Sequence, residues 1–200
     1  MALKIDPWSF PDPEQDLSGG QGPATIVLAG GCFWCTEAVY SEVEGVLSVR
    51  PGYAGDTRDK ADYRTVCTGR TKHAEAIEIR YDPARITLGR ILKLFFSIAH
   101  DPTQKDRQGA DVGPQYRSAI FYAHEDQRRI AAAYIAQIDK ARLFEGPVRT
   151  VLEPLEAFYV AEDYHHDYAA RNPQQPYIRA VTEPKVKKLR EVHGNLLKAG

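Results

Sequence analysis

The chain contains few cysteines, only Cys32, Cys35 and Cys67 among 200 residues. An odd and small number does not suit a disulfide framework, and it favours redox-active, catalytic or buried thiols in a reducing compartment. We therefore expect a cytoplasmic protein, with its cysteines as candidate functional residues.

The chain also lacks long hydrophobic runs and a surplus of charge. Its longest apolar run, near residues 91–99, is broken by Lys93, and a bilayer-spanning helix needs about 20 apolar residues. Lys and Arg number 26 against 27 Asp and Glu, without the basic excess that phosphate binding requires. The first residues also lack the basic start and apolar stretch of a secretory signal. These observations argue against a membrane or nucleic-acid partner.

What is present indicates one folded domain. The composition is 43% hydrophobic, enough for a sizeable core. Residues 1–23 are rich in proline and acids without hydrophobic periodicity, and they predict a flexible or surface-draped extension before a domain over 24–200. The pattern predicts strands at 24–29, 46–49, 73–81, 116–122 and 150–153, helices at 32–43, 88–99, 125–142, 162–171 and 183–198, and long loops at 51–63 and 100–114. This alternation favours the α/β (α+β) class, with a mixed β-sheet and flanking helices.

The segment Gly30-Gly31-Cys32-Phe33-Trp34-Cys35 lies at a predicted strand-to-helix turn. A thiol at a helix N-terminus has its pKa lowered from about 8.5, which makes Cys32 a candidate nucleophile. Cys35 follows one helical turn later, where a thiol can attack an oxidised partner. Two alternatives remain at this stage. The pair could be buried structural cysteines, or zinc ligands, although Cys67 and His73 do not complete a usual zinc spacing.

Glu75 lies in a strand pattern, on the same face as Ile77 and Ile79. Burial of that face would raise the pKa of the carboxyl and make it a general acid near neutral pH. The alternative is a half-buried Glu75 paired with a lysine or arginine. Among the tyrosines, Tyr53, Tyr63 and Tyr116 stand beside chain breaks or in long loops, where their hydroxyls can serve as hydrogen-bond donors. The adjacent His165 and His166 diverge on a helix, which favours surface or structural roles.

Six motifs occur in the order that is typical of the A class of peptide methionine sulfoxide reductases, and the chain resembles that family from residue 24 to the C-terminal helix. The motifs are Gly30–Trp34, Gly52–Gly55, Tyr63 with Val66-Cys67, His73–Ala76, Gln108–Asp111 with Gln115–Ser118, and Ala161–His165. The resemblance implies a single two-layer domain that carries out thiol-dependent reduction of the S form of methionine sulfoxide to methionine, in peptides and proteins or as the free amino acid. No metal or cofactor is expected. A cytoplasmic monomer is expected.

The resemblance also implies roles for individual residues. Cys32 matches the family's nucleophile, and Glu75 matches its proton donor to the sulfoxide oxygen. Tyr63 and Tyr116 match the hydroxyls that hydrogen-bond this oxygen. Further matches are the walls of the pocket for the S-methyl group, Phe33 and Trp34, and a carboxylate of the same site, Asp111.

The chain departs from many members of this family at the resolving cysteine. Many relatives have glycine at the position of Cys35 and carry resolving cysteines in the C-terminal tail, whereas no cysteine follows Cys67 here. From this departure we expect Cys35 to form the disulfide with a Cys32 sulfenic acid, and thioredoxin or a similar dithiol to reduce it. Cys67 is expected to be structural, with resolution as its second possible role. Two other functions stay open, a thioredoxin-like dithiol oxidoreductase, which would leave Glu75 unused, and a metal-stabilised binding module.

Overall fold

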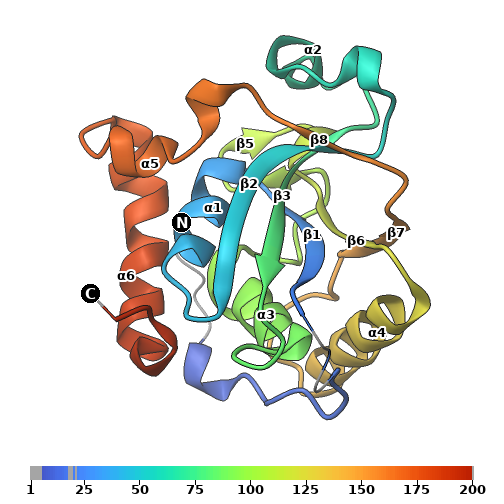
Figure 1. The fold of residues 1–200 in the computed structure, drawn as a ribbon, viewed down its shortest axis with the longest axis vertical. Coiled ribbons are helices and arrows are strands. Elements are labelled where there is room, and N and C mark those ends of the chain that lie inside the picture. Colours follow the sequence, from blue (N-terminus) through green and yellow to red (C-terminus); the bar gives the residue numbers. More distant parts are fainter. Residues whose placement is uncertain (1–5, 18–19, 21, 200) are drawn as a thin grey trace.

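The computed structural model describes residues 6–17, 20 and 22–199, which build one mixed sheet with helices (Figure 1). Six strands lie in the order β7-β6-β1-β3-β2-β8. All neighbours are antiparallel except β6 and β7, which are parallel. The strands are β1 (Ala24–Gly30), β2 (Val46–Ala54), β3 (Ala74–Tyr81), β6 (Ser118–Tyr122), β7 (Val151–Pro154) and β8 (Phe158–Val160). The mixed sheet agrees with the predicted fold class.

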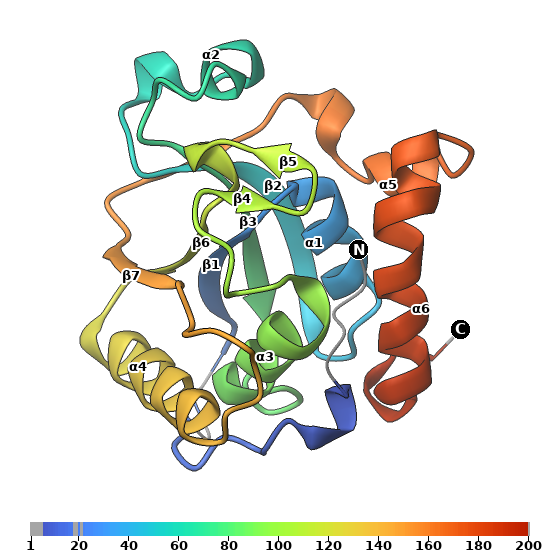
Figure 2. The same ribbon diagram turned by 180° about the vertical axis from the view of Figure 1, so that it is seen from behind.

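The helices pack on one face of this sheet (Figures 1 and 2). They are α1 (Phe33–Ser41), α3 (Leu88–Leu94), α4 (Glu125–Lys140) and α6 (Glu183–Val192), with the short α2 (Tyr63–Cys67) and α5 (Tyr168–Arg171) nearer one end. Alternation along β1 explains the two layers, because Ile26 and Leu28 face the main core under the helices. Val27 and Ala29 belong to the smaller cluster on the opposite face, as a side-chain period of two requires.

The second half of β2 differs from the sequence prediction. Residues 51–54 were expected to be a loop, but Gly52 pairs with Ala76 and Tyr53 with Glu75. The neighbouring β8, which the pattern did not predict, pairs with the same residues. Gly52 is required by this close approach, because a Cβ atom there would lie 2.3 Å from the carbonyl oxygen of Tyr159. A Pro-Gly pair is typical of a turn, but here Pro51 and Gly52 belong to a strand that is paired with β8 along one edge.

Three other predicted elements also need correction. The segment 162–171 is not one helix, because a 3₁₀ turn at Asp163–His165 is followed by Asp167 with φ of 52°, a left-handed conformation that ends helical geometry. The helix predicted at 183–198 ends at Val192. The expected loop at 100–114 contains a small hairpin of β4 (Arg107–Gln108) and β5 (Asp111–Val112).

Residues 6–17 of the N-terminal extension run across α3 and α4 (Figure 1). Phe10 is 3% exposed and its ring lies 5.7 Å from that of Phe144. The Tyr134 hydroxyl donates to the carbonyl oxygen of Pro11 at 3.0 Å, and the Gly89 N–H donates to Asp16 at 2.8 Å. One aromatic anchor and several polar contacts therefore hold this segment against the helices.

Replacing Phe10 with alanine is expected to lower the free energy of unfolding by about 3 kcal/mol, because it leaves a cavity in the main core. Urea titration followed by circular dichroism measures the change. Trp8→Ala is the matched control, since Trp8 is 69% exposed, and its effect should stay within about 0.5 kcal/mol. Equal stabilities of the two variants would show that the extension does not contribute to the core.

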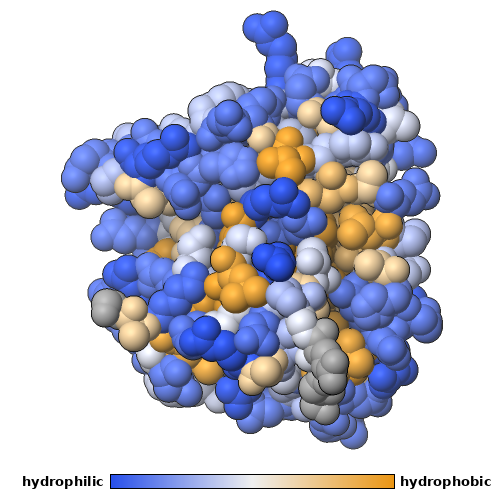
Figure 3. Space-filling model, in the orientation of Figure 1, coloured by the Kyte–Doolittle hydropathy of each residue, from blue (hydrophilic) through white to orange (hydrophobic). Residues whose placement is uncertain are grey.

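No helix within residues 6–17, 20 and 22–199 is long and apolar enough to cross a membrane. On the face shown in Figure 3, hydrophobic side chains form separate patches divided by hydrophilic ones.

Candidate active site

The site is built where β1 turns into α1, beside the middle of the sheet. Gly31 has φ of 86°, and a Cβ atom on it would lie 2.6 Å from Cβ of Gln108 on β4. Only glycine suits both the backbone conformation and this contact. The turn places Cys32 at the N-cap position of α1, with its carbonyl oxygen accepting from the Cys35 N–H at 3.1 Å.

Glu75 points from β3 toward the start of α1. It is 2% exposed, and its Oε2 accepts from the Phe33 N–H at 3.2 Å. Burial raises the pKa of Glu75 to about 8; the Phe33 hydrogen bond opposes this shift, and the charge of Asp111 adds to it. The alternative of a half-buried Glu75 paired with a lysine or arginine is wrong. At neutral pH this carboxyl is protonated and can donate a proton.

The two cysteines are free and buried, with Cys32 8% and Cys35 1% exposed. Burial raises the pKa of the Cys32 thiol, so the low pKa predicted from the helix N-terminus is wrong. Desolvation outweighs the partial charge of the helix end here. The hydrogen bond from Cys32 and the positive charge of Lys185 instead hold the pKa of Cys35 below its usual value. The surroundings of Cys35 therefore favour its ionised form more than those of Cys32 do.

Two of the predicted hydroxyl donors, Tyr63 and Tyr116, feel the charge of the same carboxyl. Tyr63 begins α2 and Tyr116 ends a 3₁₀ turn at Pro114–Tyr116. Burial raises the pKa of both phenols, and the charge of Glu75 adds to the shift. Both hydroxyls thus keep their protons and remain donors. Asp111, on β5, accepts from the Tyr177 hydroxyl at 2.5 Å and acts on Glu75 by its charge.

Aromatic rings form one side of the site. Phe33 is fully buried, and its ring lies 6.4 Å from that of Tyr63. Trp34 is half-buried and stacks on Tyr168 with ring centroids 3.9 Å apart. Its indole N–H donates to Nδ1 of His165 at 3.0 Å. Trp34 is thus fixed in orientation, and it is more accessible than Phe33.

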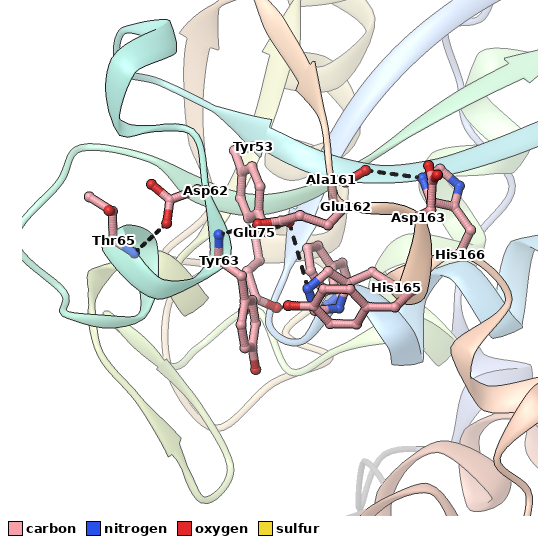
Figure 4. A network of polar contacts seen from close by, with 12 residues as sticks. Tyr53, Asp62, Tyr63, Thr65, Glu75, Ala161, Glu162, Asp163, His165 and His166 are labelled. Atoms are coloured by element: carbon pink, nitrogen blue, oxygen red, sulfur yellow. Dashed lines mark hydrogen bonds and ion pairs between the residues drawn. The ribbon is translucent and has the colours of Figure 1, made fainter.

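Sequence reasoning gave no role to Glu162 and favoured a surface or structural role for His165. The structure places both residues beside the aromatic rings of the site (Figure 4). Glu162 accepts from the Tyr53 hydroxyl and from the Tyr63 N–H, both at 2.8 Å. His165 is fully buried, its ring lies 4.4 Å from that of Tyr63, and burial lowers its pKa, consistent with a neutral ring that accepts from Trp34. Glu162 therefore ties β2, α2 and the turn at 163–165 together. The motif Ala161–His165 was the only sequence signal for this cluster.

The sequence analysis also predicted no role for Tyr177. Besides its bond to Asp111, its hydroxyl lies 3.8 Å from Sγ of Cys35. It comes from a segment where Pro173 and Pro176 weakened the helical pattern. Tyr177 thus connects the C-terminal segment to both the carboxylate and the cysteine pair.

Cys67 ends α2 and is half-buried. Burial raises its pKa, and the hydroxyl of Tyr63 opposes the shift.

Among the residues that the structure describes, no group of three His, Cys, Asp or Glu side chains could hold a metal ion. A buried acid, phenol donors and two thiols at one place define a thiol-dependent redox site.

Comparisons with known proteins agree with this class. The model of the family described as Peptide methionine sulfoxide reductase matches residues 24–196. MsrA 2 of Synechocystis is 46% identical and covers 98% of this chain and 94% of its own. MsrA of Thermus thermophilus is 50% identical, covering 86% of this chain and 96% of its own.

Solved structures show the same likeness. Mxr1 from Saccharomyces cerevisiae in reduced form matches with a TM-score of 0.71 and 33% identity, over 80% of this chain and 92% of that one. Methionine sulfoxide reductase A of Corynebacterium diphtheriae gives 0.67 and 38%, over 78% of each chain. Mxr1 has also been solved in complex with Trx2.

The chain belongs to the peptide methionine sulfoxide reductase family. This assignment confirms the resemblance and the predicted fold class. The family assignment also argues against the two other functions considered for the cysteines, a thioredoxin-like dithiol oxidoreductase and a metal-stabilised binding module.

Proposed function

We propose that the chain reduces methionine-S-sulfoxide, free or in peptides and proteins, to methionine through Cys32. The observation that carries the proposal is Glu75, a buried carboxyl protonated at neutral pH, bonded to the first N–H of the helix that Cys32 precedes. A sulfoxide needs both a nucleophile at sulfur and an acid at oxygen. This site supplies the two groups from adjoining elements.

The first step joins the Cys32 sulfur to the electron-poor sulfur of the sulfoxide. Negative charge then develops on the sulfoxide oxygen, and Glu75 gives it a proton while Tyr63 and Tyr116 donate hydrogen bonds. The oxygen then transfers from the methionine sulfur to the Cys32 sulfur as the bond between the two sulfurs breaks, which releases methionine and leaves Cys32 as a sulfenic acid. The proton of the Cys32 thiol restores that of Glu75, so atoms and charge balance over the step.

Phe33 and Trp34 are proposed to receive the S-methyl group, because they form the apolar wall next to Cys32. Asp111 is proposed to shape the polar side of the same site through its bond to Tyr177. The contrast between these two sides would orient a sulfoxide, whose methyl group and oxygen differ in polarity.

The second step is proposed to join Cys35 to Cys32 in a disulfide with release of water. An intramolecular disulfide is reduced by thiol–disulfide exchange with an external dithiol. Thioredoxin or a similar protein fits this need, as the Mxr1 complex with Trx2 illustrates for that relative. Because one chain holds all of these groups, the proposal needs only a monomer, and a thiol-dependent reaction suits a reducing cytoplasmic setting.

Single-turnover reduction of each diastereomer of a methionine sulfoxide peptide, with mass mapping of the resulting disulfide, tests the proposal. The S form should give methionine and a Cys32–Cys35 disulfide. Reduction of the R form alone, or the absence of methionine from both, would contradict the proposed reaction. A disulfide that contains Cys67 would move the resolving role to that residue.

Cys35→Ser should release about one methionine per enzyme and then stop, because the sulfenic acid has no adjacent thiol with which to condense. Methionine is counted in the presence of thioredoxin and its reductase. Cys67→Ser is the control and should continue to turn over. Continued thioredoxin-coupled turnover by Cys35→Ser would refute its resolving role.

A further inference from the structure

A buried lysine on α6 has no role in the steps described so far. Lys185 is 6% exposed, and its Nζ donates to the carbonyl oxygen of Ala99 at 2.7 Å. Within the described part of the chain, no carboxylate forms an ion pair with it. The Ala99 carbonyl oxygen accepts from only one of the three N–H donors of the ammonium, and removing the charge of a lysine from water is costly. A negative charge near the ammonium of Lys185 would offset this cost.

Cys35 is the group that fits this requirement. Thr182, one helical turn before Lys185, has its Oγ1 3.1 Å from Sγ of Cys35. The Tyr177 hydroxyl approaches the same sulfur from the preceding turn. The charge of Lys185 acts on this thiol and favours its ionised form. One C-terminal segment therefore surrounds Cys35 with two hydroxyls and a positive charge.

We propose that Lys185 is a positioning residue for the resolving step, in which its ammonium, together with the Thr182 hydroxyl, stabilises negative charge on the sulfur of Cys35. This inference rests on the proposed function and assigns a residue to its second half. Lys185 does not touch the sulfoxide. It acts through Cys35, whose readiness to attack depends on its thiolate fraction.

The step balances without an external oxidant. The Cys35 sulfur attacks the sulfur of the Cys32 sulfenic acid, the S–S bond forms and the S–O bond breaks. Cys35 is oxidised and the Cys32 sulfur is reduced by the same electron pair. The leaving hydroxide takes the proton of Glu75 and departs as water, and the proton released earlier by Cys35 returns to Glu75 through solvent.

The charged and titratable groups that face Cys35 come from every element around it. Cys32 precedes α1, Glu75 lies on β3, Tyr177 lies before α6, and Lys185 lies on α6. Lys185 alone among them carries a positive charge. Removing this charge must therefore raise the pKa of Cys35 and move its ionisation to higher pH.

Lys185→Gln tests the inference, because glutamine keeps an N–H donor for Ala99 and removes the charge. Rapid quenching measures methionine release, and trapping of the sulfenic acid with a carbon nucleophile measures its conversion to the disulfide. We expect disulfide formation to slow about tenfold at pH 7, with its pH profile moved up by about one unit. Methionine release should change less than about threefold, since chemistry at Cys32 precedes the affected step.

Two variants serve as controls. Lys185→Arg keeps the charge and should restore the pH profile toward that of the wild type. Lys187→Gln makes the same substitution on the same helix at a side chain that is 74% exposed, and it should change neither step.

Several results would overturn the inference. One is an unchanged rate and pH profile of disulfide formation in Lys185→Gln, and another is equal slowing of both steps without a shifted profile, as a purely structural role predicts. If Lys185→Gln does not fold, Thr182→Val must move the same profile upward, and an unmoved profile overturns the inference. These results leave the proposed function intact, whereas absence of the first methionine in the wild type overturns the function itself.

Discussion

Replacing Cys32 with serine is expected to abolish methionine sulfoxide reduction, with a loss of at least about 10⁴-fold in the first turnover. A hydroxyl is a far weaker nucleophile than a thiol toward sulfur, and no sulfenic acid can form on oxygen. Methionine released from a sulfoxide peptide by a stoichiometric amount of enzyme is the measurement. Cys67→Ser should keep the wild-type first turnover.

The fold should tolerate Cys32→Ser well. Cys32 is the N-cap residue of α1 and makes no capping hydrogen bond with its side chain, whereas serine is among the preferred N-cap residues. The midpoint of thermal unfolding should equal or exceed that of the wild type. Methionine production by a folded Cys32→Ser variant would transfer the nucleophilic role to another residue.

Glu75→Gln is expected to slow the first turnover by about 10²- to 10³-fold, because glutamine cannot give a proton to the developing oxygen charge. With its pKa raised to about 8, Glu75 is protonated below this pH and loses its proton above it. The wild-type rate should therefore fall as pH rises beyond about 8, and Glu75→Gln should lack this fall. Rapid quenching between pH 6 and 10 (about two units on either side of the pKa) compares the two profiles.

The same variant should gain stability at neutral pH. In the unfolded chain Glu75 titrates near its ordinary value of 4.5, while the folded protein retains the proton up to about pH 8. The favourable contribution of the protonated carboxyl is complete at low pH and is lost as pH rises through this interval. Glu75→Gln should thus unfold at a higher temperature than the wild type at pH 8 and near the same temperature at pH 4. A lower melting temperature at pH 8 would contradict the burial argument.

The centre of the site was predictable because its residues lie in regular patterns. Strict alternation placed Glu75 on the face of Ile77 and Ile79, and the glycine pair marked the turn before Cys32. In both cases the local pattern and the tertiary structure agree. The motifs of the family then indicated that Cys32 and Glu75 belong to one site.

The surroundings of the site were less predictable, because they depend on contacts between distant parts of the chain. Glu162 and Tyr177 lie in irregular segments without periodicity, so no local pattern indicated which way they point. The pKa of Cys32 was mispredicted for a related reason, since the helix end is visible in the sequence and the burial around the thiol is not. Strand β8 was not predicted for the same reason, because its pairing with Gly52 joins segments that are far apart in the sequence.

The contact between Thr182 and Cys35 also orders events during synthesis. Cys32, Cys35 and Glu75 leave the ribosome well before residues 177–185, which enclose Cys35 in the finished fold. Until that last segment docks, Cys35 is a thiol without its hydroxyl and ammonium neighbours. The pairing of β3 with β1 and β2, which positions Glu75, needs only residues 24–81. The surroundings of Cys35 are completed only when the C-terminal part of the chain has folded onto it.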